Sequence, residues 1–583
     1  MSVMFHGIGV SKGIAIGQAY VLYRERPEIL EYAIAPGRIE HEIARFHTAR
    51  AQAQKQLEAI KQKFSADVPH DITHFIDTHL LMLDDPVLCE GTVEHIRHRV
   101  CNAEWALQSQ CDRLEKVFDD MDDAYLKTRK DDILHVVQRI QRCLACDTDA
   151  DAPEDLQGDH LKGRIIIADD LTPADTLVMR HQKIAGFITE FGGPLSHTAI
   201  LARNLGIPAI VGVRNVRQLI KAGDWLVVDG GQGMLIAEPD SHSLRHFRDL
   251  QKDEKRRQQN LFSLKNKPAV TTDGRRINLN GNIDGPDDVR TLRQYDHTGV
   301  GLYRTEMLFM ERDEWPSEQE QFEVYSRALR ALKGHPLTIR TADLGADKEM
   351  RDTLQHGPMA HNPALGLRAI RRCLKEPHLF MLQLKAILRT GAYGPVNMMI
   401  PMLTCVSELD QVIVLIEQAK TELRAERKRF NPHLPLGAMI EVPAAALSAT
   451  AFARKLDFLS IGTNDLIQYT LAMDRIDDEV SHLFKPLHPS VLKLIDMTLQ
   501  AGEKIGIEVS LCGEMASDPL YTRLLLGMGL RNFSVQAGSL LEIKHIINHS
   551  HLGKLATLVR PMLDLATPDE IEQAVNEMNR QFA

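Results

Sequence analysis

Length, composition and charge already narrow the class of protein. The chain has 583 residues, 44% hydrophobic and 25% charged, which is typical of a globular protein of about three to five domains. Its formal net charge of −10 disfavours a general nucleic-acid binder, and its eight cysteines show no disulfide framework. No apolar run is long enough to span a membrane and residues 1–17 do not resemble a signal peptide, so we expect a cytoplasmic protein without membrane contact.

The N-terminal quarter combines a short glycine-rich start with a long helical stretch. Residues 7–17 are punctuated by glycines and lead into a strand candidate at 19–22. From 36 to 146, apolar residues repeat at helical spacing and few strand signals intervene. The pattern predicts a helical bundle inserted after one strand.

The chain then returns to short apolar segments. The strand candidates cover residues 164–168, 184–189, 209–213 and 225–229. Their alternation with short helical pieces predicts a compact α/β domain over 147–238, which the opening strand within 1–35 is expected to join, so that the domain is discontinuous. Residues 239–266 are charged on almost every face, which fits a solvated helix between domains or a plain charged linker.

The remaining chain, residues 267–583, alternates strand and helix candidates. The strand candidates cover residues 277–283, 300–304, 337–343, 396–402, 436–442, 458–464, 508–513 and 532–535. Eight βα-type units in one region favour a (β/α)₈ barrel over an open, doubly wound sheet.

One motif of the α/β domain points to chemistry. Within residues 192–206, two glycines allow a tight turn, Ser196 can cap a helix, and His197 then lies near the helix N-terminus. Free backbone N–H groups there favour an anion, and a neutral imidazole has a nucleophilic nitrogen. On spacing alone, His197 is either the acceptor of a phosphate group or an ordinary residue at a helix start.

Polar residues recur at the ends of the predicted barrel strands. They are Arg304, Arg340, Glu441, Asn464, Asp465 and Cys512. In a barrel these strand ends converge on one face, where active sites are built. Each arginine alone could be a salt-bridge residue, and Cys512 alone could be a buried small side chain. Their shared position shifts the interpretation towards a functional site.

The types of these residues predict a ligand. The guanidinium groups of Arg304 and Arg340 suit phosphate and carboxylate. Arg368 and Arg475 are further candidates for the same role. The carboxylates of Glu441 and Asp465 suit a hard divalent ion such as Mg²⁺, which often also binds substrate phosphate. A small phosphorylated acid with two anionic groups would fit both the arginines and the cation held by the carboxylates.

Seven segments carry this pattern in one order along the chain. They are residues 192–206, 301–310, 340–348, 362–371, 439–443, 460–475 and 512–515. Together they resemble Enzyme I of the bacterial phosphoenolpyruvate-dependent sugar phosphotransferase system, and the resemblance covers essentially the whole chain.

The resemblance implies a multidomain α/β architecture with a role for each domain. It assigns 1–35 and 147–238 to a phosphohistidine α/β domain, 36–146 to an inserted helical domain that binds the carrier protein HPr, and 239–266 to a linker helix. Residues 267–583 would form a (β/α)₈ barrel that binds phosphoenolpyruvate and forms a homodimer.

Site roles are carried over residue by residue. By resemblance, His197 is the phosphorylated histidine, Thr172 orients its ring, and Cys512 donates a proton to the enolate. Glu441 and Asp465 would bind Mg²⁺. The residues that would contact phosphoenolpyruvate are Arg304, Arg340, Arg368, Asn464, Asp465 and Arg475. The sequence departs from the family at Pro194-Leu195, where Arg and Thr or Ser are usual, and at Ala346, where Gly is usual; neither change removes a reacting group.

The implied activity is that of a phosphoenolpyruvate-protein phosphotransferase (EC 2.7.3.9). The phosphoryl group would pass to His197 and then to a histidine of HPr, with release of pyruvate, as the first step of sugar uptake. The alternative is a regulatory phosphorelay protein of the same family that signals metabolic state without sugar transport. Pyruvate phosphate dikinase and phosphoenolpyruvate synthase share the motifs but need a large nucleotide-binding domain, and only a helical stretch precedes the α/β core here.

Overall fold

A computed structural model describes most of the 583 residues. The described residues are 2–22, 29–64, 70–119, 124–145, 161–309 with gaps at 172–174, 176–178, 180–181, 194–195, 197, 200–201 and 204–205, then 314–344, 362–475 and 480–582. Thr172 and His197 lie outside the described residues, as do Pro194-Leu195 and Ala346. The chain divides into two compact units, Met1–Arg256 and Arg257–Ala583.

The first unit contains an eight-stranded mixed sheet with the order β1-β8-β7-β3-β4-β5-β6-β2. The strands are β1 Val3–His6, β2 Ile8–Ser11, β3 Ile14–Val21, β4 Ile165–Ala168, β5 Gly186–Thr189, β6 Ala209–Val211, β7 Trp225–Asp229 and β8 Met234–Ala237. Every residue of β4 and β5 is buried, as their continuous apolar sequences require. Because β3 pairs with β4 and β7, the N-terminal strands complete a domain formed mainly by later residues, and the predicted discontinuous α/β domain is confirmed.

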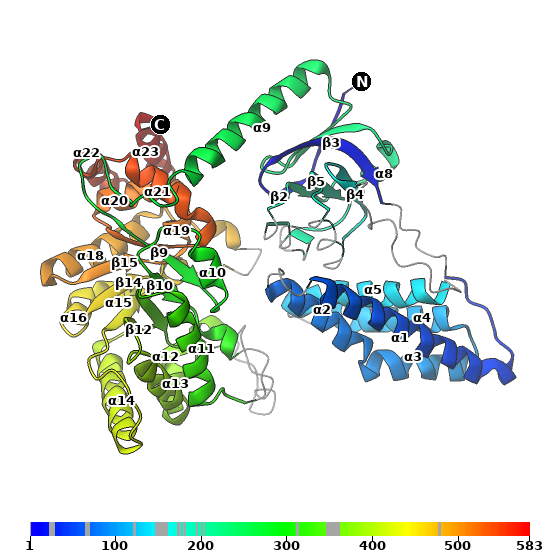
Figure 1. The fold of residues 1–583 in the computed structure, drawn as a ribbon, viewed down its shortest axis with the longest axis horizontal. Helices are drawn as coiled ribbons and strands as arrows, with labels where there is room; N and C mark the ends of the chain where they lie inside the picture. Colours follow the sequence, from blue (N-terminus) through cyan, green and yellow to red (C-terminus); the bar gives the residue numbers. More distant parts are fainter. Residues whose placement is uncertain are drawn as a thin grey trace. The chain divides into compact units, whose positions relative to one another are not determined.

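A helical bundle occupies the interval between β3 and β4 (Figure 1). Its helices are α1 Ile39–Phe64, α2 His70–Leu83, α3 Pro86–Arg99, α4 Ala103–Asp119 and α5 Ala124–Ala145. Phe46, Leu107 and Ile140 form part of its core and are completely buried. Arg45 on α1 pairs with Glu104 on α4, which links the two helices at their polar edge. The predicted inserted bundle is confirmed.

Two further helices belong to this part of the chain: the short α8, Val216–Leu219, lies between β6 and β7, and the long α9, Ser241–Phe262, follows β8. Asp240 begins α9 by accepting a hydrogen bond of 2.7 Å from the Ser243 N–H. Phe247 is the one buried residue of α9, so the helix presents charged side chains over most of its surface. Of the two sequence interpretations, the linker helix is confirmed.

The second unit is a closed barrel of eight parallel strands (Figure 1). The strands are β9 Asn278–Ile283, β10 Val300–Tyr303, β11 Leu337–Arg340, β12 Val396–Ile400, β13 Leu436–Ile440, β14 Phe458–Ile461, β15 Glu508–Leu511 and β16 Asn532–Val535. The first strand, β9, pairs with the last, β16, from Asn278 opposite Asn532 to Gly281 opposite Val535. This pairing closes the sheet and excludes the open, doubly wound alternative.

Helices cover the outside of the barrel. They are α10 Asp288–Leu292, α11 Glu318–Ala331, α12 Ala369–Lys375, α13 Pro377–Thr390, α14 Val406–Ala425, α15 Pro443–Leu447, α16 Ala449–Ala453, α17 Thr463–Leu471, α18 Pro489–Ile505, α19 Glu514–Ser517, α20 Thr522–Met528, α21 Leu540–Asn548, α22 Leu552–Val559 and α23 Pro568–Gln581. Their apolar faces join the strands in one continuous core. Across the described ranges, no helix combines the length and the apolar character needed to cross a membrane.

Candidate active site

The carboxyl ends of the barrel strands bring most of the predicted residues of the second unit to one rim. Arg340 is the last residue of β11, Glu441 directly follows β13, and Cys512 directly follows β15. Asp465 lies in the first turn of α17, which begins two residues after β14 ends. Parallel strands in a closed barrel point their carboxyl ends to one face, so the sequence pattern alone dictated this convergence.

Arg340 is a buried cation among carboxylates. Its side chain is 7% exposed, and Nη2 donates a hydrogen bond of 2.7 Å to Glu306 Oε1. Nη1 lies 3.6 Å from Asp343 Oδ2 and 3.7 Å from the Met439 sulfur. Burial lowers the pKa of Arg340, but the negative charges of Glu306, Asp343 and Glu441 outweigh it and hold that pKa above its usual range.

In the part of the chain that the structure describes, the ion pair of Arg340 and Glu306 includes two buried polar atoms that lack protein partners. Within the described residues, Arg340 Nε and Glu306 Oε2 are shielded from solvent and make no hydrogen bond. Buried donors and acceptors are rarely left unsatisfied, so such atoms at a strand-end rim need a ligand, a water or an ion to complete them. The rim therefore has the polar character of a binding site and not only of a structural ion pair.

Arg368 is the second arginine of the rim. Its Nε and Nη2 donate to the two carboxylate oxygens of Asp343 at 3.1 and 2.9 Å, a bidentate pairing. Nη1 donates to the Tyr469 hydroxyl at 2.9 Å and lies 3.8 Å from Asp465. Burial lowers the pKa of Arg368, but the charge and hydrogen bonds of Asp343 raise it further, so the pKa lies above its usual range.

The carboxylates of the rim form a group suited to a cation. Glu441 is 1% exposed and accepts a hydrogen bond of 2.7 Å from the Met402 N–H. Burial, together with the nearby charge of Asp465, raises the pKa of Glu441 to about 8, although Arg340 opposes this. A divalent ion between Glu441 and Asp465 would relieve this repulsion, and an all-oxygen donor set fits a hard ion.

Cys512, which follows β15, is part of a small buried apolar cluster of the barrel. Its side chain contacts the cluster of Leu302, Met399 and Met439, and the residue is 2% exposed. The Ser460 hydroxyl donates to the Cys512 sulfur at 3.4 Å. Burial raises the pKa of the Cys512 thiol, so the group stays protonated near neutral pH. A protonated thiol suits a proton donor better than a nucleophile.

The remaining predicted residues have other partners. Arg304 is partly exposed and donates to Asp284 at 3.1 Å. Asn464 exchanges two hydrogen bonds of 2.9 Å with Glu514, one to its side chain and one from its backbone N–H. The Arg475 side chain is exposed. The structure thus joins Arg340, Arg368, Glu441 and Asp465 in one network, whereas Arg304 pairs with Asp284 outside it and Arg475 is exposed.

Three residues of this network were missed by the sequence reasoning: Glu306, Asp343 and Tyr469. Each lies inside a segment that had already been singled out, 301–310, 340–348 or 460–475. Glu306 begins a short 3₁₀ turn after β10, and Asp343 follows β11, so strand-end position was the available signal. The sequence could not show that these carboxylates pair with the arginines.

The described residues around His197 support a helix start. Gly192 has a φ of +108°, a conformation that favours glycine at this turn. Ser196 Oγ accepts a hydrogen bond of 3.3 Å from the Ala199 N–H, as expected of a helix cap. Thr198, which directly follows His197 in the sequence, is 2% exposed.

Comparisons with known proteins cover the same regions. Family models for phosphoenolpyruvate-utilising enzymes match residues 258–552 as the PEP-binding domain, 6–129 as the N-terminal domain and 161–233 as the mobile domain. A phosphoenolpyruvate-protein phosphotransferase from Cupriavidus necator is 44% identical over 100% of both chains. One from Listeria innocua is 37% identical over 99% of both chains.

The chain belongs to the phosphoenolpyruvate-protein phosphotransferase family. The resemblance inferred from the motifs is therefore confirmed, as is the enzyme class that it implied. Membership supports phosphoenolpyruvate-dependent phosphotransfer. Among solved structures, an NMR structure of the protein named Enzyme I (nEIt) is 32% identical and covers 43% of this chain and 99% of its own, with a TM-score of 0.37.

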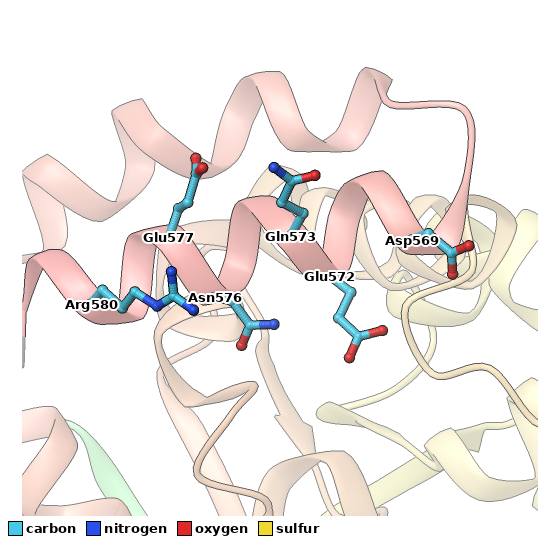
Figure 2. A pocket seen from close by; sticks show the side chains of 6 residues that line it. All are labelled: Asp569, Glu572, Gln573, Asn576, Glu577 and Arg580. Carbon is cyan, nitrogen blue, oxygen red and sulfur yellow. The ribbon is translucent and has the colours of Figure 1, made fainter.

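A separate hollow lies on α23, away from the strand-end rim. Figure 2 shows its lining side chains, which all come from this one helix: Asp569, Glu572, Gln573, Asn576, Glu577 and Arg580. None of them belongs to the residues predicted for the phosphotransferase site. The hollow is the outer polar face of a helix, and we assign no chemistry to it.

Proposed function

We propose that the protein transfers the phosphoryl group of phosphoenolpyruvate to His197 and then to a histidine of the carrier protein HPr, and that it releases pyruvate. The observation that carries this proposal is the buried network of Arg340 and Arg368 with the carboxylates of Glu441 and Asp465, together with the buried thiol of Cys512 at another strand end of the same barrel. One rim then holds anion-binding groups, cation-binding groups and an acid.

The arginines bind the substrate in this proposal. Phosphoenolpyruvate carries a phosphate and a carboxylate, and planar guanidinium groups bind both in a bidentate manner. Arg340 and Arg368 are held in place by buried carboxylates, Arg304 pairs with the more exposed Asp284, and Arg475 is exposed and can close onto the ligand. Asn464 supplies an amide beside them. Preorganised charges of this kind stabilise the transferring phosphoryl group.

Glu441 and Asp465 would hold Mg²⁺ in this site. The raised pKa of Glu441 supports the assignment, because crowded carboxylates gain most from a shared cation. When bound, the ion neutralises phosphate charge. The residues of the chain itself keep the two carboxylates in place: the Met402 N–H orients Glu441, and Arg368 lies beside Asp465.

The proposed phosphoryl transfer exchanges one bond to phosphorus for another. A neutral ring nitrogen of His197 forms a bond to phosphorus while the bond from phosphorus to the enol oxygen breaks. The electron pair of that bond leaves as the enolate, and the Cys512 thiol donates a proton to its terminal carbon, which gives pyruvate. The resulting thiolate regains a proton from solvent. Thr172 orients the His197 ring.

The partners follow from the same assignment. The helical bundle α1–α5 would bind HPr, and the barrel would form a homodimer. The use of the phosphorelay to regulate other proteins without sugar transport remains a second candidate function, since it needs the same transfer steps. Retention of all reacting groups, His197, Cys512 and the rim residues, favours an active phosphotransferase in either case.

Replacing His197 by alanine tests the proposal directly. With phosphate-labelled phosphoenolpyruvate and Mg²⁺, the wild type is expected to gain an acid-labile, base-stable label, as a phosphohistidine does, and to pass it to added HPr. The His197→Ala variant is expected to gain none, because the proposed acceptor nitrogen is gone. Equal labelling of both proteins would show that another residue is the acceptor.

Replacing Cys512 by alanine separates the two halves of the reaction. We expect labelling of His197 to persist while pyruvate forms about 100-fold more slowly, because the positioned acid is lost. Pyruvate is measured with a coupled reductase assay in single turnover. The control is Cys405→Ala, which removes an exposed thiol of the same unit. Unchanged pyruvate formation in Cys512→Ala would exclude this thiol as the acid.

A further inference from the structure

A polar chain within the first unit connects the helical bundle to the segment that contains His197. His135, on α5, has a side chain that is 11% exposed, and its Nε2 lies 3.0 Å from Oδ2 of Asp170, which follows β4. The contact joins residues 35 positions apart and crosses from the inserted bundle to the α/β domain. None of the steps described above uses His135.

Asp170 also forms hydrogen bonds with Thr198, which directly follows His197 in the sequence, and with Leu171. Its Oδ1 accepts hydrogen bonds from the Leu171 N–H at 2.8 Å and from the Thr198 hydroxyl at 3.1 Å. The same hydroxyl lies 2.9 Å from the Leu171 carbonyl, so its single proton is shared between the two acceptors. Asp170 therefore ties the residue after His197 to the segment that leads into Thr172.

The carboxylate at the centre of this chain is kept ionised. Burial opposes ionisation of Asp170, but the hydrogen bond and charge of His135, with the bonds from Leu171 and Thr198, outweigh it and hold the pKa of Asp170 below its usual range. An ionised carboxylate accepts stronger hydrogen bonds than a neutral one. The link between bundle and phosphohistidine segment is thus charge-assisted.

The His135 ring is itself supported from the bundle side. His79, on α2, packs against it edge-on with ring centroids 6.2 Å apart, and His79 Nε2 lies 3.2 Å from Asp132 Oδ1. Asp132 lies one turn before His135 on α5 and is completely buried. Burial lowers the pKa of His79, so that ring is neutral near pH 7 and packs without repelling its neighbour.

We infer that His135 is a positioning residue for the phosphoryl transfer: through Asp170 and Thr198, it holds the segment around His197 in the orientation that accepts the phosphoryl group. The inference rests on the proposed function. Correct placement of a nucleophile contributes to rate even when no contact to the substrate is made, because small misplacements are costly. The bundle then contributes to the chemistry of His197 in addition to its proposed docking role.

A bound metal ion is the competing interpretation of these side chains. His79, Asp132 and His135 each offer a ligand atom, and these atoms lie within 4.8 Å of one another. However, His79 already bonds to Asp132, and the positive charge of Arg139 acts on His79 and disfavours a cation beside it. We therefore favour the hydrogen-bonded chain, and zinc content is one arm of the test.

Two variants of His135 separate positioning from folding. His135→Leu removes the donor to Asp170, whereas His135→Gln keeps a neutral donor of similar reach. His98→Gln, an exposed histidine on α3, is the matched control. We expect the maximal rate of His197 labelling to fall about tenfold in the leucine variant, to recover to within about threefold in the glutamine variant, and to be unchanged in the control. The KM for phosphoenolpyruvate is expected to change less than about twofold, because its binding groups lie on the barrel.

Further readouts make the outcome decisive. If the chain of bonds acts as one unit, Asp170→Asn is expected to lower the rate similarly, and the double variant to add little. Hydrogen exchange at the Leu171 N–H, measured on the full chain without substrate, is expected to accelerate in His135→Leu but not in His135→Gln. Wild-type labelling rates and unchanged exchange in His135→Leu would overturn the inference.

The competing explanations give different results. Equal losses in the leucine and glutamine variants, accompanied by a lowered melting temperature, would show a purely structural role and overturn the inference. Stoichiometric zinc in the purified wild type that is lost in His135→Leu would assign the effect to a metal and also overturn it. Failure of the proposed function has its own signature, the absence of label on the wild type, and the exchange measurement then still decides whether His135 orders this segment.

Discussion

Replacing Arg340 by methionine is expected to abolish phosphoenolpyruvate-dependent labelling and to lower the free energy of unfolding by about 3–5 kcal/mol. In the proposed mechanism the substrate loses a buried guanidinium, and Glu306 and Asp343 lose the cation that offsets their burial. Breaking one side of a buried pair leaves an uncompensated charge, which is why the expected cost is large. Steady-state labelling and urea unfolding monitored by fluorescence measure the two effects.

The control for this variant is Arg330→Met, which truncates an exposed arginine on α11 whose Nε donates to a backbone carbonyl of its own helix. It is expected to keep both wild-type stability and labelling. If Arg340→Met unfolded within about 1 kcal/mol of the wild type, the rim carboxylates would have found another partner and the ion-pair account would fail. A stable variant that still labels would also remove Arg340 from the substrate site.

Replacing Glu441 by glutamine is expected to change stability and activity in opposite directions. The amide removes a buried carboxylate that is crowded by Asp465 and can still accept the hydrogen bond from the Met402 N–H. The metal-free protein should gain stability near pH 8, on the order of 4 kcal/mol if the whole pKa shift of Glu441 is relieved. Labelling should fall at least about 100-fold, because the proposed cation loses a charged ligand. The rise in melting temperature on addition of Mg²⁺ with phosphoenolpyruvate should shrink correspondingly.

The pH dependence of this stability gives a sharper test. Burial and the charge of Asp465 raise the pKa of Glu441 from its ordinary value of 4.5 to about 8 in the folded state, so between these pH values the folded protein binds more protons than the unfolded chain. Its contribution to stability is present at low pH and is lost as pH rises through about 8. Glu441→Gln should flatten this slope in metal-free buffer. An unchanged slope would mean that Glu441 titrates normally.

The sequence predicted the barrel and its rim because both depend on local patterns. Short apolar strands alternate with helices, and the polar residue after each strand, such as Glu441 or Cys512, must lie at the carboxyl end. The sequence could not predict which acidic side chains pair with which arginines. Asp343 pairs with Arg368, which lies 25 residues further along the chain, and no local sequence pattern shows this choice of partner. The contact of His135 with Asp170 was missed for the same reason, since it crosses between two independently patterned domains.

The closure of the barrel by β9 and β16 has a consequence for synthesis. Asn278 and Asn532 are joined by a side-chain hydrogen bond across 254 residues, so the sheet cannot be sealed until the last strand has left the ribosome. Until then, the growing barrel exposes the unpaired edge of β9, a surface prone to wrong pairing. The strands of the first unit are complete by Ala237, so that unit can fold while the barrel is still being made. A nascent chain that stalls before β16 would therefore carry a finished first unit and an aggregation-prone open sheet.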